Sequence, residues 1–405
     1  MTSGSGRRPD GALSVFIVAG EESGDRLGGA LMQALSRRFD GPITFEGVGG
    51  RDMAAQGLHS LFPIEDIAIM GFIAIPLRLA DILRRIRETV AAVVATQPDV
   101  LVIIDSPDFS HRVARRVRAA APSIPIVDYV SPTVWAWRPG RARAMRAYVD
   151  HVLALLPFEP AAHARLGGPP CTYVGHPLVE SATALRPNPD EARRRNASPP
   201  AVLVLPGSRT SEIKRLLAVF GEAASLLAQR NGPLELILPT VPRQLQRVTK
   251  ETASWPTRPR IIVDAEQKAA AFRTARAALA ASGTVTLELA IARVPTVVAY
   301  TASLIEELIV RPLIKVDTIV LTNLVLDEKV MPEFVQRQVR AERLAAALAS
   351  LIDDTPERNK QLRAFARLDA VMGIGAIVPS ERAAAIVIDY ARRGRAALLA
   401  KEAKP

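Results

Sequence analysis

Residues 100–109 read VLVIIDSPDF, a short run that shows how the whole chain is built. Five apolar residues, Val100 to Ile104, end at an aspartate, and a Ser-Pro pair follows directly. A continuous apolar run of this length is typical of a strand buried on both faces of a parallel sheet. Ser106 stands where a helix N-cap belongs, and Pro107 at the first helical position. The run therefore predicts a buried strand, a tight turn and a helix.

The same alternation of a short apolar run with a helical stretch recurs along both halves of the chain. In the first half we expect strands at Val15–Ala19, Ile43–Val48, Val100–Ile104, Ile126–Val130, His151–Leu156 and Thr172–Val174. In the second half we expect them at Ala201–Leu205, Leu234–Leu238, Ile261–Val263, Ala277–Ala281, Thr296–Tyr300 and Thr318–Leu321. Such alternation produces parallel sheets with helices on both faces. The pattern predicts an α/β protein with two Rossmann-like domains.

A segment rich in proline and charge separates the two halves, and a sheet interior would not tolerate it. The predicted organisation is a disordered N-terminal extension (1–13), a first domain (14–185), a linker (186–200), a second domain (201–375) and a closing helix with a tail (376–405). The closing helix has an apolar face of Ala, Ile, Val and Leu. We expect it to pack on the body of the protein or on a partner subunit.

The composition is that of a globular, basic protein. Its 405 residues are 49% hydrophobic, and the formal net charge is +11. A nucleic-acid-binding module would need a clustered basic face with stacking aromatics, whereas here the basic residues are scattered and only 5% of residues are aromatic. A positive surface also suits phosphorylated substrates or anionic lipid. We therefore expect no nucleic acid among the partners.

Signatures of metals, dinucleotides and secretion are missing from the sequence. The five histidines show no metal-ligand spacing, and no glycine turn matches G-x-G-x-x-G. We expect a metal-independent reaction without a cofactor. Cys171 is the single cysteine, which excludes an internal disulfide and fits a reducing compartment. The apolar run at Val15–Ala19 is too short for a signal peptide, so the sequence predicts a cytoplasmic protein.

In open parallel sheets, ligands bind beyond the carboxyl ends of the strands. The first turn reads AGEESGD, residues 19–25, and Gly20 in it allows close approach of the backbone to a ligand. Ser23 fits an N-cap and Asp25 a first-turn acid, which leaves Glu21 as the candidate functional residue. Asp105 lies at the end of the apolar strand, where a general base should lie.

An aromatic and polar cluster follows the next strand. Residues 129–138 read YVSPTVWAWR and hold two of the three tryptophans of the chain. Core packing would explain either Trp135 or Trp137. With Ser131 and Arg138 beside them, the two indoles would also suit a sugar or an acyl chain, because aromatic faces stack and polar tips form hydrogen bonds.

Two turns of the second half predict phosphate binding. The run LPGSRTSE, residues 205–212, places Ser208 and Arg209 where a strand becomes a helix, and an arginine there can hold a phosphate bidentately. The run ASGTVTLE, residues 281–288, gathers N–H groups and hydroxyls at Ser282, Gly283 and Thr284 for a diphosphate. Glu288 stands between leucines and needs a partner, for which a ribose diol is suitable.

Residues 67–77, IAIMGFIAIPL, precede a helix with several arginines. The segment is too short to span a bilayer. It fits a buried loop and helix start, or equally an interfacial contact in which Met70, Phe72 and Ile73 enter a membrane surface beside the basic helix.

Together these motifs resemble bacterial lipid-A-disaccharide synthase, an inverting glycosyltransferase family of the GT-B fold. The resemblance spans Ser14 to Arg393 and rests on AGEESGD (19–25), IMGF (69–72), IDSPDF (104–109), YVSPTVWAWR (129–138), LPFE (156–159), VGHP (174–177), LPGSR (205–209) and ASGTVTLE (281–288). It implies two Rossmann-like domains that face each other across a cleft, with C-terminal helices.

The resemblance also implies a reaction in lipid A biosynthesis of Gram-negative bacteria. UDP-2,3-diacylglucosamine would donate its sugar to the 6-hydroxyl of 2,3-diacylglucosamine 1-phosphate, with release of UDP and formation of a β-linked disaccharide. The enzyme would work on the cytoplasmic face of the inner membrane, and a homodimer is possible in the family.

Residue by residue, the resemblance makes Asp105 the proposed base and places Glu21 near the sugars. Arg209 and the turn at 282–284 would hold the diphosphate, Glu288 the ribose, and Asn323 the uridine side. The chain departs from the family at Thr322, where a proline usually precedes the asparagine. Two other enzymes stay open as alternatives: a UDP-sugar epimerase of the same fold, and a transferase with a soluble acceptor. Neither would need the apolar segment 67–77.

Overall fold

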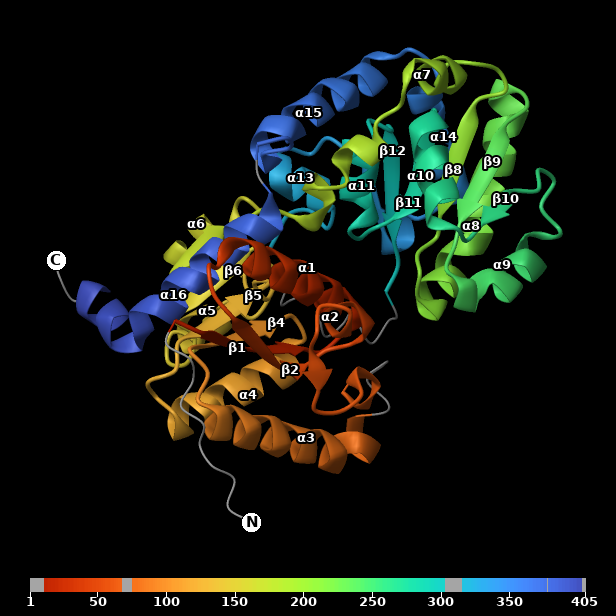
Figure 1. Ribbon diagram of the computed structural model, residues 1–405. Helices are drawn as coiled ribbons and strands as arrows, with labels where there is room; N and C mark the ends of the chain where they lie inside the picture. The colour runs from red at the N-terminus through yellow and green to blue at the C-terminus, as the bar shows by residue number, and fades with distance from the viewer. Residues whose placement is uncertain (1–10, 68–74, 303–314, 377, 403–405) are drawn as a thin grey trace. The chain divides into compact units, whose positions relative to one another are not determined.

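The computed structural model describes residues 11–67, 75–302, 315–376 and 378–402. The chain divides into two compact units. Unit 1 is made of two stretches of sequence, residues 1–177 and 377–405, and unit 2 comprises Leu178–Ala376. We describe each unit by itself (Figure 1).

Unit 1 is built on a seven-stranded parallel sheet in the order β3-β2-β1-β4-β5-β6-β7. Its strands are β1 (Leu13–Ala19), β2 (Ile43–Val48), β3 (His59–Ser60), β4 (Val100–Ile104), β5 (Ile126–Tyr129), β6 (His151–Ala154) and β7 (Cys171–Tyr173). All six expected strands are confirmed within two residues at each end, and only the two-residue β3 is new. The run at 100–104 is buried along its whole length, as its composition predicted.

Helices cover both faces of this sheet. They are α1 (Glu22–Arg38), α2 (Arg51–Ala54), α3 (Ile75–Thr96), α4 (Pro107–Ala120), α5 (Gly140–Met145), α6 (Glu159–Arg165) and α16 (Pro379–Glu402). Alternate residues of β1 point to opposite faces: Phe16 packs in the core under α3 and α4, whereas Val15 and Ile17 pack in the core under α1 and α16. The central strands are therefore enclosed on both sides.

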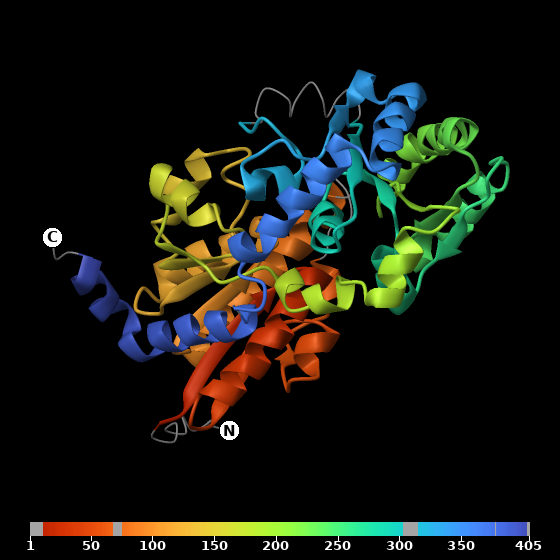
Figure 2. The same ribbon diagram turned by 90° about the horizontal axis from the view of Figure 1, so that it is seen from above.

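The last helix, α16, belongs to unit 1. Ala383, Ala384, Val387 and Ile388 are buried in the same core as β1 and α1, and α16 lies along α1 (Figures 1 and 2). The helix breaks at Gly394, whose φ of 63° is the left-handed conformation that glycine adopts without strain. The expected closing helix thus packs on the body of its own chain.

Unit 2 holds a six-stranded parallel sheet in the order β10-β9-β8-β11-β12-β13. Its strands are β8 (Ala201–Leu205), β9 (Glu235–Pro239), β10 (Arg260–Ile262), β11 (Ala277–Ala281), β12 (Thr296–Tyr300) and β13 (Glu333–Val335). The strand expected at Thr318–Leu321 is wrong. Helix α13 begins at Leu321 instead, and the strand that pairs with β12 is β13.

The helices of unit 2 are α7 (Pro189–Arg195), α8 (Thr210–Asn231), α9 (Leu245–Thr252), α10 (Ala265–Thr274), α11 (Val285–Ile291), α13 (Leu321–Leu326), α14 (Ala341–Ile352) and α15 (Pro356–Met372). Helices α8 and α14 pack together against one face of the sheet, where Phe220 and Leu344 join Val202 and Val204 in the core. The sheet and its helices form a second Rossmann-like unit.

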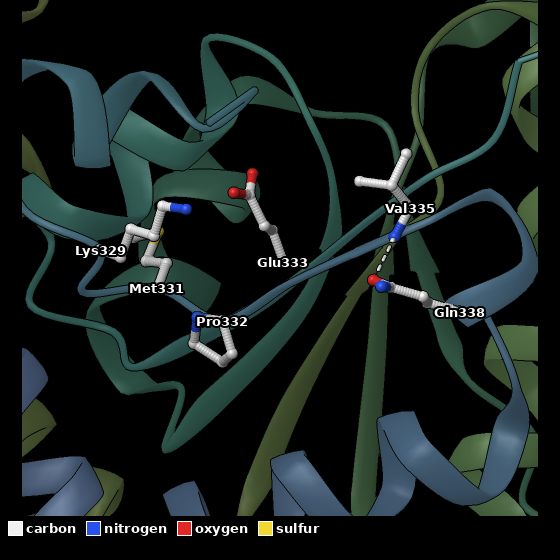
Figure 3. Close-up of a pocket in the computed structure, with 6 residues that line it drawn as sticks. All are labelled: Lys329, Met331, Pro332, Glu333, Val335 and Gln338. Carbon is white, nitrogen blue, oxygen red and sulfur yellow. Dashed lines mark hydrogen bonds between the residues drawn. The ribbon is translucent and has the colours of Figure 1, made fainter. Parts of the chain in front are cut away.

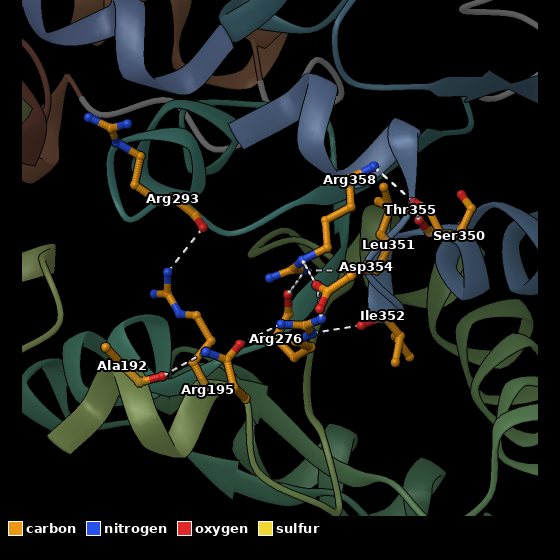
Figure 4. A network of polar contacts seen from close by, with 11 residues as sticks. Ala192, Arg195, Arg276, Arg293, Ser350, Leu351, Ile352, Asp354, Thr355 and Arg358 are labelled. Atoms are coloured by element: carbon orange, nitrogen blue, oxygen red, sulfur yellow. Dashed lines mark hydrogen bonds and ion pairs between the residues drawn. The ribbon is translucent and has the colours of Figure 1, made fainter. Parts of the chain in front are cut away.

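The segment 186–200 does not join the units as a linker, because it folds as part of unit 2. Helix α7 lies in it and packs on α10. The guanidinium of Arg195 is buried and donates to the carbonyls of Phe272, Arg273, Ala292 and Arg293 at 2.9–3.1 Å. Figure 4 shows the contact with Arg293. These contacts satisfy carbonyls at the ends of α10 and α11. The crossings between the units lie instead at Pro177/Leu178 and at 376–377.

Candidate active site

Asp105 stands at the carboxyl end of β4 on strained backbone. Asp105 and Ser106 both have positive φ, 51° and 47°, which non-glycine residues rarely adopt. Two hydrogen bonds hold the turn: Asp105 N–H donates to the carbonyl of Tyr129 at 3.1 Å, and Ser110 Oγ donates to the carbonyl of Asp105 at 2.6 Å. Strain of this kind is retained where the surrounding structure enforces it, often at functional sites.

Gly20, at the end of β1, makes this turn possible. A Cβ at position 20 would lie 2.3 Å from Cβ and 2.5 Å from Oγ of Ser106, closer than side chains can approach. The neighbouring strands β1 and β4 can therefore both end here only because residue 20 lacks a side chain. Ser106 stands at the N-cap position of α4, but its side chain makes no cap hydrogen bond, contrary to the expectation.

Burial raises the pKa of Asp105, and the nearby negative charge of Asp128 raises it further. The N–H of Ser106, 2.7 Å from Oδ1 of Asp105, and a hydrogen bond from Ser23 act in the opposite direction. A carboxylate with a raised pKa is a stronger base. The structure thus joins Ser23 of the first turn to Asp105.

In the first turn, the expected N-cap role of Ser23 is wrong, whereas Asp25 lies in the first turn of α1 as expected. Helix α1 begins at Glu22 with Glu21 at its N-cap position, so Ser23 is not the cap. Asp25 is buried and accepts hydrogen bonds from the N–H groups of Gly50, Asp52 and Met53 at 2.7–3.1 Å. Asp25 thus lies in the first turn of α1, as expected, and also caps the N-terminus of α2. Glu21 itself is exposed directly after β1.

The aromatic cluster after β5 is anchored by α6. Trp135 is half-buried, and its indole N–H donates to Oε1 of Glu159 at 3.0 Å. Ser131 is buried, with its hydroxyl 2.8 Å from Nε2 of His163. The expected residues Ser131 and Trp135 are therefore brought together by two α6 side chains that sequence analysis missed. The LPFE motif that contains Glu159 was the available signal.

Trp137 and Arg138 interact only within their own loop in the contacts described. The indole N–H of Trp137 donates to Thr133 Oγ1 at 2.9 Å, and the guanidinium carbon of Arg138 lies 4.3 Å from the centroid of the Trp137 ring. Arg138 also has a positive φ, 52°. The two tryptophans thus differ: α6 holds Trp135, whereas Trp137 rests on loop neighbours.

In unit 2, the N–H groups expected to bind an anion at Ser208 and Arg209 are already engaged. Both donate to Oε2 of Glu212 at 3.1 Å, and the Arg209 guanidinium lies 3.2 Å from Oε1 of the same carboxylate. The Arg209 side chain remains 78% exposed, so this pair is a weak surface interaction. The carboxylate of Glu212 therefore accepts the hydrogen bonds that the sequence predicted for a phosphate.

The turn after β11 keeps its open geometry. Gly283 has a φ of 151°, and nothing lies within 4 Å of the position that a Cβ would take. Ser282 Oγ donates to the carbonyl of Ile319 at 2.6 Å, and Thr284 stands at the N-cap position of α11. This turn is tied by its serine to the chain before α13.

Glu288 has a protein partner that the sequence did not reveal. Nζ of Lys268, on α10, lies 2.5 Å from Oε2 of Glu288. The Lys268 side chain is 37% exposed and that of Glu288 20% exposed, so the pair remains accessible.

Asn323 is buried and committed to its own loop. Its Nδ2 donates to Thr318 Oγ1 at 3.3 Å and to the carbonyl of Met331 at 3.0 Å. Its Oδ1 accepts from the N–H groups of Val330 and Met331 at 3.0 and 2.9 Å. Thr322, the departure from the family pattern, is also buried and donates to the carbonyl of Thr286 at 2.9 Å. Thr322 thus ties α13 to α11, whereas Asn323 holds the loop on either side of α13.

Met70, Phe72 and Ile73 lie outside the described residues, so the structure does not test their expected contact with a membrane. Among the residues that are described, no helix is long and apolar enough to cross a bilayer. Within the same ranges, no group of three or more His, Cys, Asp or Glu side chains is arranged to hold a metal ion.

A hollow of about 490 Å³ lies on the edge of the second sheet (Figure 3). It is lined by Lys329, Met331, Pro332, Glu333, Val335 and Gln338. The carboxylate of Glu333 already accepts from Thr318 Oγ1 at 3.0 Å and from the N–H of Ile319 at 2.9 Å. None of the predicted active-site residues lines this hollow. Its one acidic residue, Glu333, is already engaged in structural hydrogen bonds.

A family model described as lipid-A-disaccharide synthetase matches residues 15–386. The chain belongs to this family. The lipid-A-disaccharide synthase of Nitrobacter hamburgensis is 58% identical over 391 residues, which cover 96% of this chain and 99% of that protein. One from Rhodopseudomonas palustris is also 58% identical, over 392 residues that cover 97% of this chain and 98% of that protein.

Solved structures confirm the GT-B type of fold for this lipid-A-disaccharide synthetase family member. Acinetobacter baumannii MurG superposes with a TM-score of 0.55 at 15% identity, covering 93% of this chain and 99% of its own. The UDP-GlcNAc 2-epimerase of Neisseria meningitidis has a TM-score of 0.56 at 11% identity, with coverage of 93% and 98%. At such identities the likeness concerns the fold alone. Membership of the family makes the chain a glycosyltransferase of lipid A biosynthesis, as the motifs predicted.

Proposed function

We propose that this chain transfers 2,3-diacylglucosamine from UDP-2,3-diacylglucosamine to the 6-hydroxyl of 2,3-diacylglucosamine 1-phosphate, which forms the β-1,6-linked disaccharide and releases UDP. The observation that carries the proposal is Asp105: a partly buried carboxylate with a raised pKa, held on strained backbone at the carboxyl end of a central strand.

In the proposed step, Asp105 accepts the proton of the acceptor 6-hydroxyl as its oxygen attacks the anomeric carbon of the donor. The bond from that carbon to the diphosphate breaks, UDP leaves with the electron pair, and the configuration inverts. Burial strengthens the base, because desolvation disfavours the charged carboxylate and therefore favours uptake of the proton. Glu21, exposed after the adjacent strand β1, would position the sugars.

Unit 2 would hold the nucleotide. The open turn at 282–284 would offer the diphosphate the N–H groups of Gly283 and Thr284 and the Thr284 hydroxyl, since the Ser282 hydroxyl already donates to Ile319. Glu288 would offer the ribose an acceptor that Lys268 orients. Arg209 would exchange its weak surface pair with Glu212 for a phosphate, together with the N–H of Ser208. Asn323 would act indirectly, because its amide is occupied in shaping the loop beside α11.

The acceptor would bind unit 1 at Ser131, Trp135, Trp137 and Arg138, close in sequence to the end of β5. Gly20 would keep the turns of β1 and β4 close enough to present Asp105. Because both substrates carry acyl chains, we propose peripheral attachment to the cytoplasmic face of the inner membrane through Met70, Phe72 and Ile73, and a homodimer is compatible with this arrangement.

The test is release of UDP from UDP-2,3-diacylglucosamine in detergent, with and without 2,3-diacylglucosamine 1-phosphate. We expect release that requires the acceptor and falls by about 10²- to 10⁴-fold in Asp105→Asn, the range for loss of a general base. Asp108→Asn is the matched control, since Asp108 is 85% exposed in the first turn of α4. Release without acceptor, or epimerised UDP-sugar as the product, would overturn the proposal.

A further inference from the structure

Glu159 is a first-turn acid of α6, but its contacts reach beyond its own helix. It is 3% exposed at the start of α6, and its two carboxylate oxygens serve different elements. Oε2 accepts from the N–H of Leu156 at 2.9 Å, which closes the turn before α6. Oε1 accepts the indole N–H of Trp135 at 3.0 Å, across 24 residues of chain.

Trp135 is fixed on a second side as well. The ring of Phe158 packs edge-on against it, with centroids 5.0 Å apart and an interplanar angle of 86°. A ring held by its N–H and by an edge contact cannot rotate about its side-chain bonds without losing both interactions. Trp135 as a whole residue is only half-buried.

The start of the same loop is held independently. Buried Ser131 lies 2.8 Å from Nε2 of buried His163, one turn further along α6. Two side chains of one short helix thus hold both ends of the segment 131–135. Burying a carboxylate costs free energy unless hydrogen bonds compensate for it, and here the indole of Trp135 and the N–H of Leu156 supply them.

From this geometry we infer that Glu159 is a positioning residue of the acceptor site: it orients Trp135 so that the indole face packs on the sugar ring or acyl chain of the acylated glucosamine phosphate. The inference rests on the proposed function. It assigns to the LPFE motif the task of shaping the surface on which the acceptor lies, and it separates Trp135, which is held in place, from the loop-supported Trp137.

Burial raises the pKa of Glu159 to about 7. The titratable groups that act on it electrostatically, or on which it acts, are Asp128 of β5 and Cys171 and Tyr173 of β7, and His163 shares its helix. A neutral carboxyl is a weaker acceptor than a carboxylate. The hydrogen bond from Trp135 to Glu159 is therefore strongest above pH 7 and weakens below it.

The test measures KM for the acceptor at saturating donor in Glu159→Gln. Measured above the pKa of Glu159, the variant replaces a charged acceptor with a neutral amide, and we expect acceptor KM to rise about tenfold while kcat and donor KM stay within about threefold. Trp135→Phe should give a similar rise, and the double variant no further one, because both changes remove the same contact. Two variants serve as controls. Glu357→Gln, the control for Glu159→Gln, removes an exposed first-turn acid of α15, and Trp255→Phe, the control for Trp135→Phe, removes an indole of unit 2.

The inference would be overturned if Glu159→Gln lowered kcat and raised donor KM as much as it raised acceptor KM. Additive effects in the double variant would also overturn it. Fluorescence distinguishes this failure from failure of the proposed function. The Trp135 emission, taken as the difference between wild type and Trp135→Phe, should shift in Glu159→Gln and respond to dispersed 2,3-diacylglucosamine 1-phosphate without any turnover. An unchanged emission in Glu159→Gln would show that the carboxyl does not orient the ring.

Discussion

Nζ of Lys268 lies 2.5 Å from Oε2 of Glu288, and the two residues come from consecutive helices, α10 and α11. Neither side chain is fully buried, so a ligand can reach the pair. The ammonium neutralises the carboxylate and limits its rotation. If Glu288 receives the ribose diol, Lys268 determines the direction in which its free oxygen points.

Lys268→Met should therefore weaken nucleotide binding. We expect the Kd for UDP, measured by titration calorimetry, to rise about five- to tenfold, which corresponds to a loss of about 1 kcal/mol of binding free energy. Lys268→Arg keeps the charge, so its Kd for UDP should lie between those of the wild type and of Lys268→Met. Tighter binding of UDP to Lys268→Met would show instead that the lysine competes with the ribose for Glu288.

Gly20→Ala should reduce activity by moving Asp105. The new Cβ would meet Ser106 at 2.3 Å, and relief requires the turn after β4 to shift. We expect kcat to fall at least tenfold, because a small misplacement of a catalytic group has a large effect on rate. The double variant Gly20→Ala/Ser106→Gly removes the clashing side chain and suits the φ of 47°, so it should recover activity. A double variant as slow as Gly20→Ala would contradict this account.

His151 should make the protein less stable in acid. Its Nδ1 lies 2.8 Å from the hydroxyl of Tyr390 on α16, its Nε2 lies 3.0 Å from Thr172 Oγ1, and burial lowers its pKa to about 4. In the unfolded chain the pKa is about 6.5, so as pH falls from 6.5 to 4 only the unfolded state takes up this proton.

The free energy of unfolding should thus decrease over that window by about 3 kcal/mol from this group. Urea unfolding of wild type and His151→Gln at pH 7 and pH 4.5 measures it. The decrease should be smaller in the variant, although His176, whose pKa is also lowered to about 4, contributes in both. Parallel decreases in the two proteins would show that His151 is not the group responsible.

Arg195→Met should destabilise unit 2. The variant leaves the carbonyls at the ends of α10 and α11 without their shared donor, in a region where Arg276 and Arg358 likewise bind carbonyls (Figure 4). We expect a loss of about 3 kcal/mol in the free energy of unfolding.

Arg195→Lys should not keep the stability of the wild type, because one ammonium cannot reproduce the planar fork of a guanidinium. Arg193→Met is the control, since Arg193 is 73% exposed on the same helix. Thermal unfolding monitored by circular dichroism compares the three variants. Equal stability of Arg195→Met and Arg193→Met would show that the carbonyls find other partners.

Local sequence was sufficient for most strands. Val100–Ile104 and Ala277–Ala281 are predicted to the residue, because a buried parallel strand requires a continuous apolar run bounded by turn residues. The run Thr318–Leu321 has a similar composition but leads into a helix, since Thr318 and Ile319 bind the side chain of Glu333 rather than a neighbouring strand. Short apolar runs do not distinguish these outcomes.

The sequence by itself determined two Rossmann-like units, the family, and the turns that carry Asp105 and the 282–284 loop, because those features depend on neighbouring residues. Only the tertiary structure decided that α16 returns to unit 1 and that residues 186–200 belong to unit 2. It alone paired Glu159 with Trp135 and Lys268 with Glu288. Such pairings join side chains 20 or more residues apart, and no local pattern encodes which of many possible partners the folded chain brings within hydrogen-bonding distance.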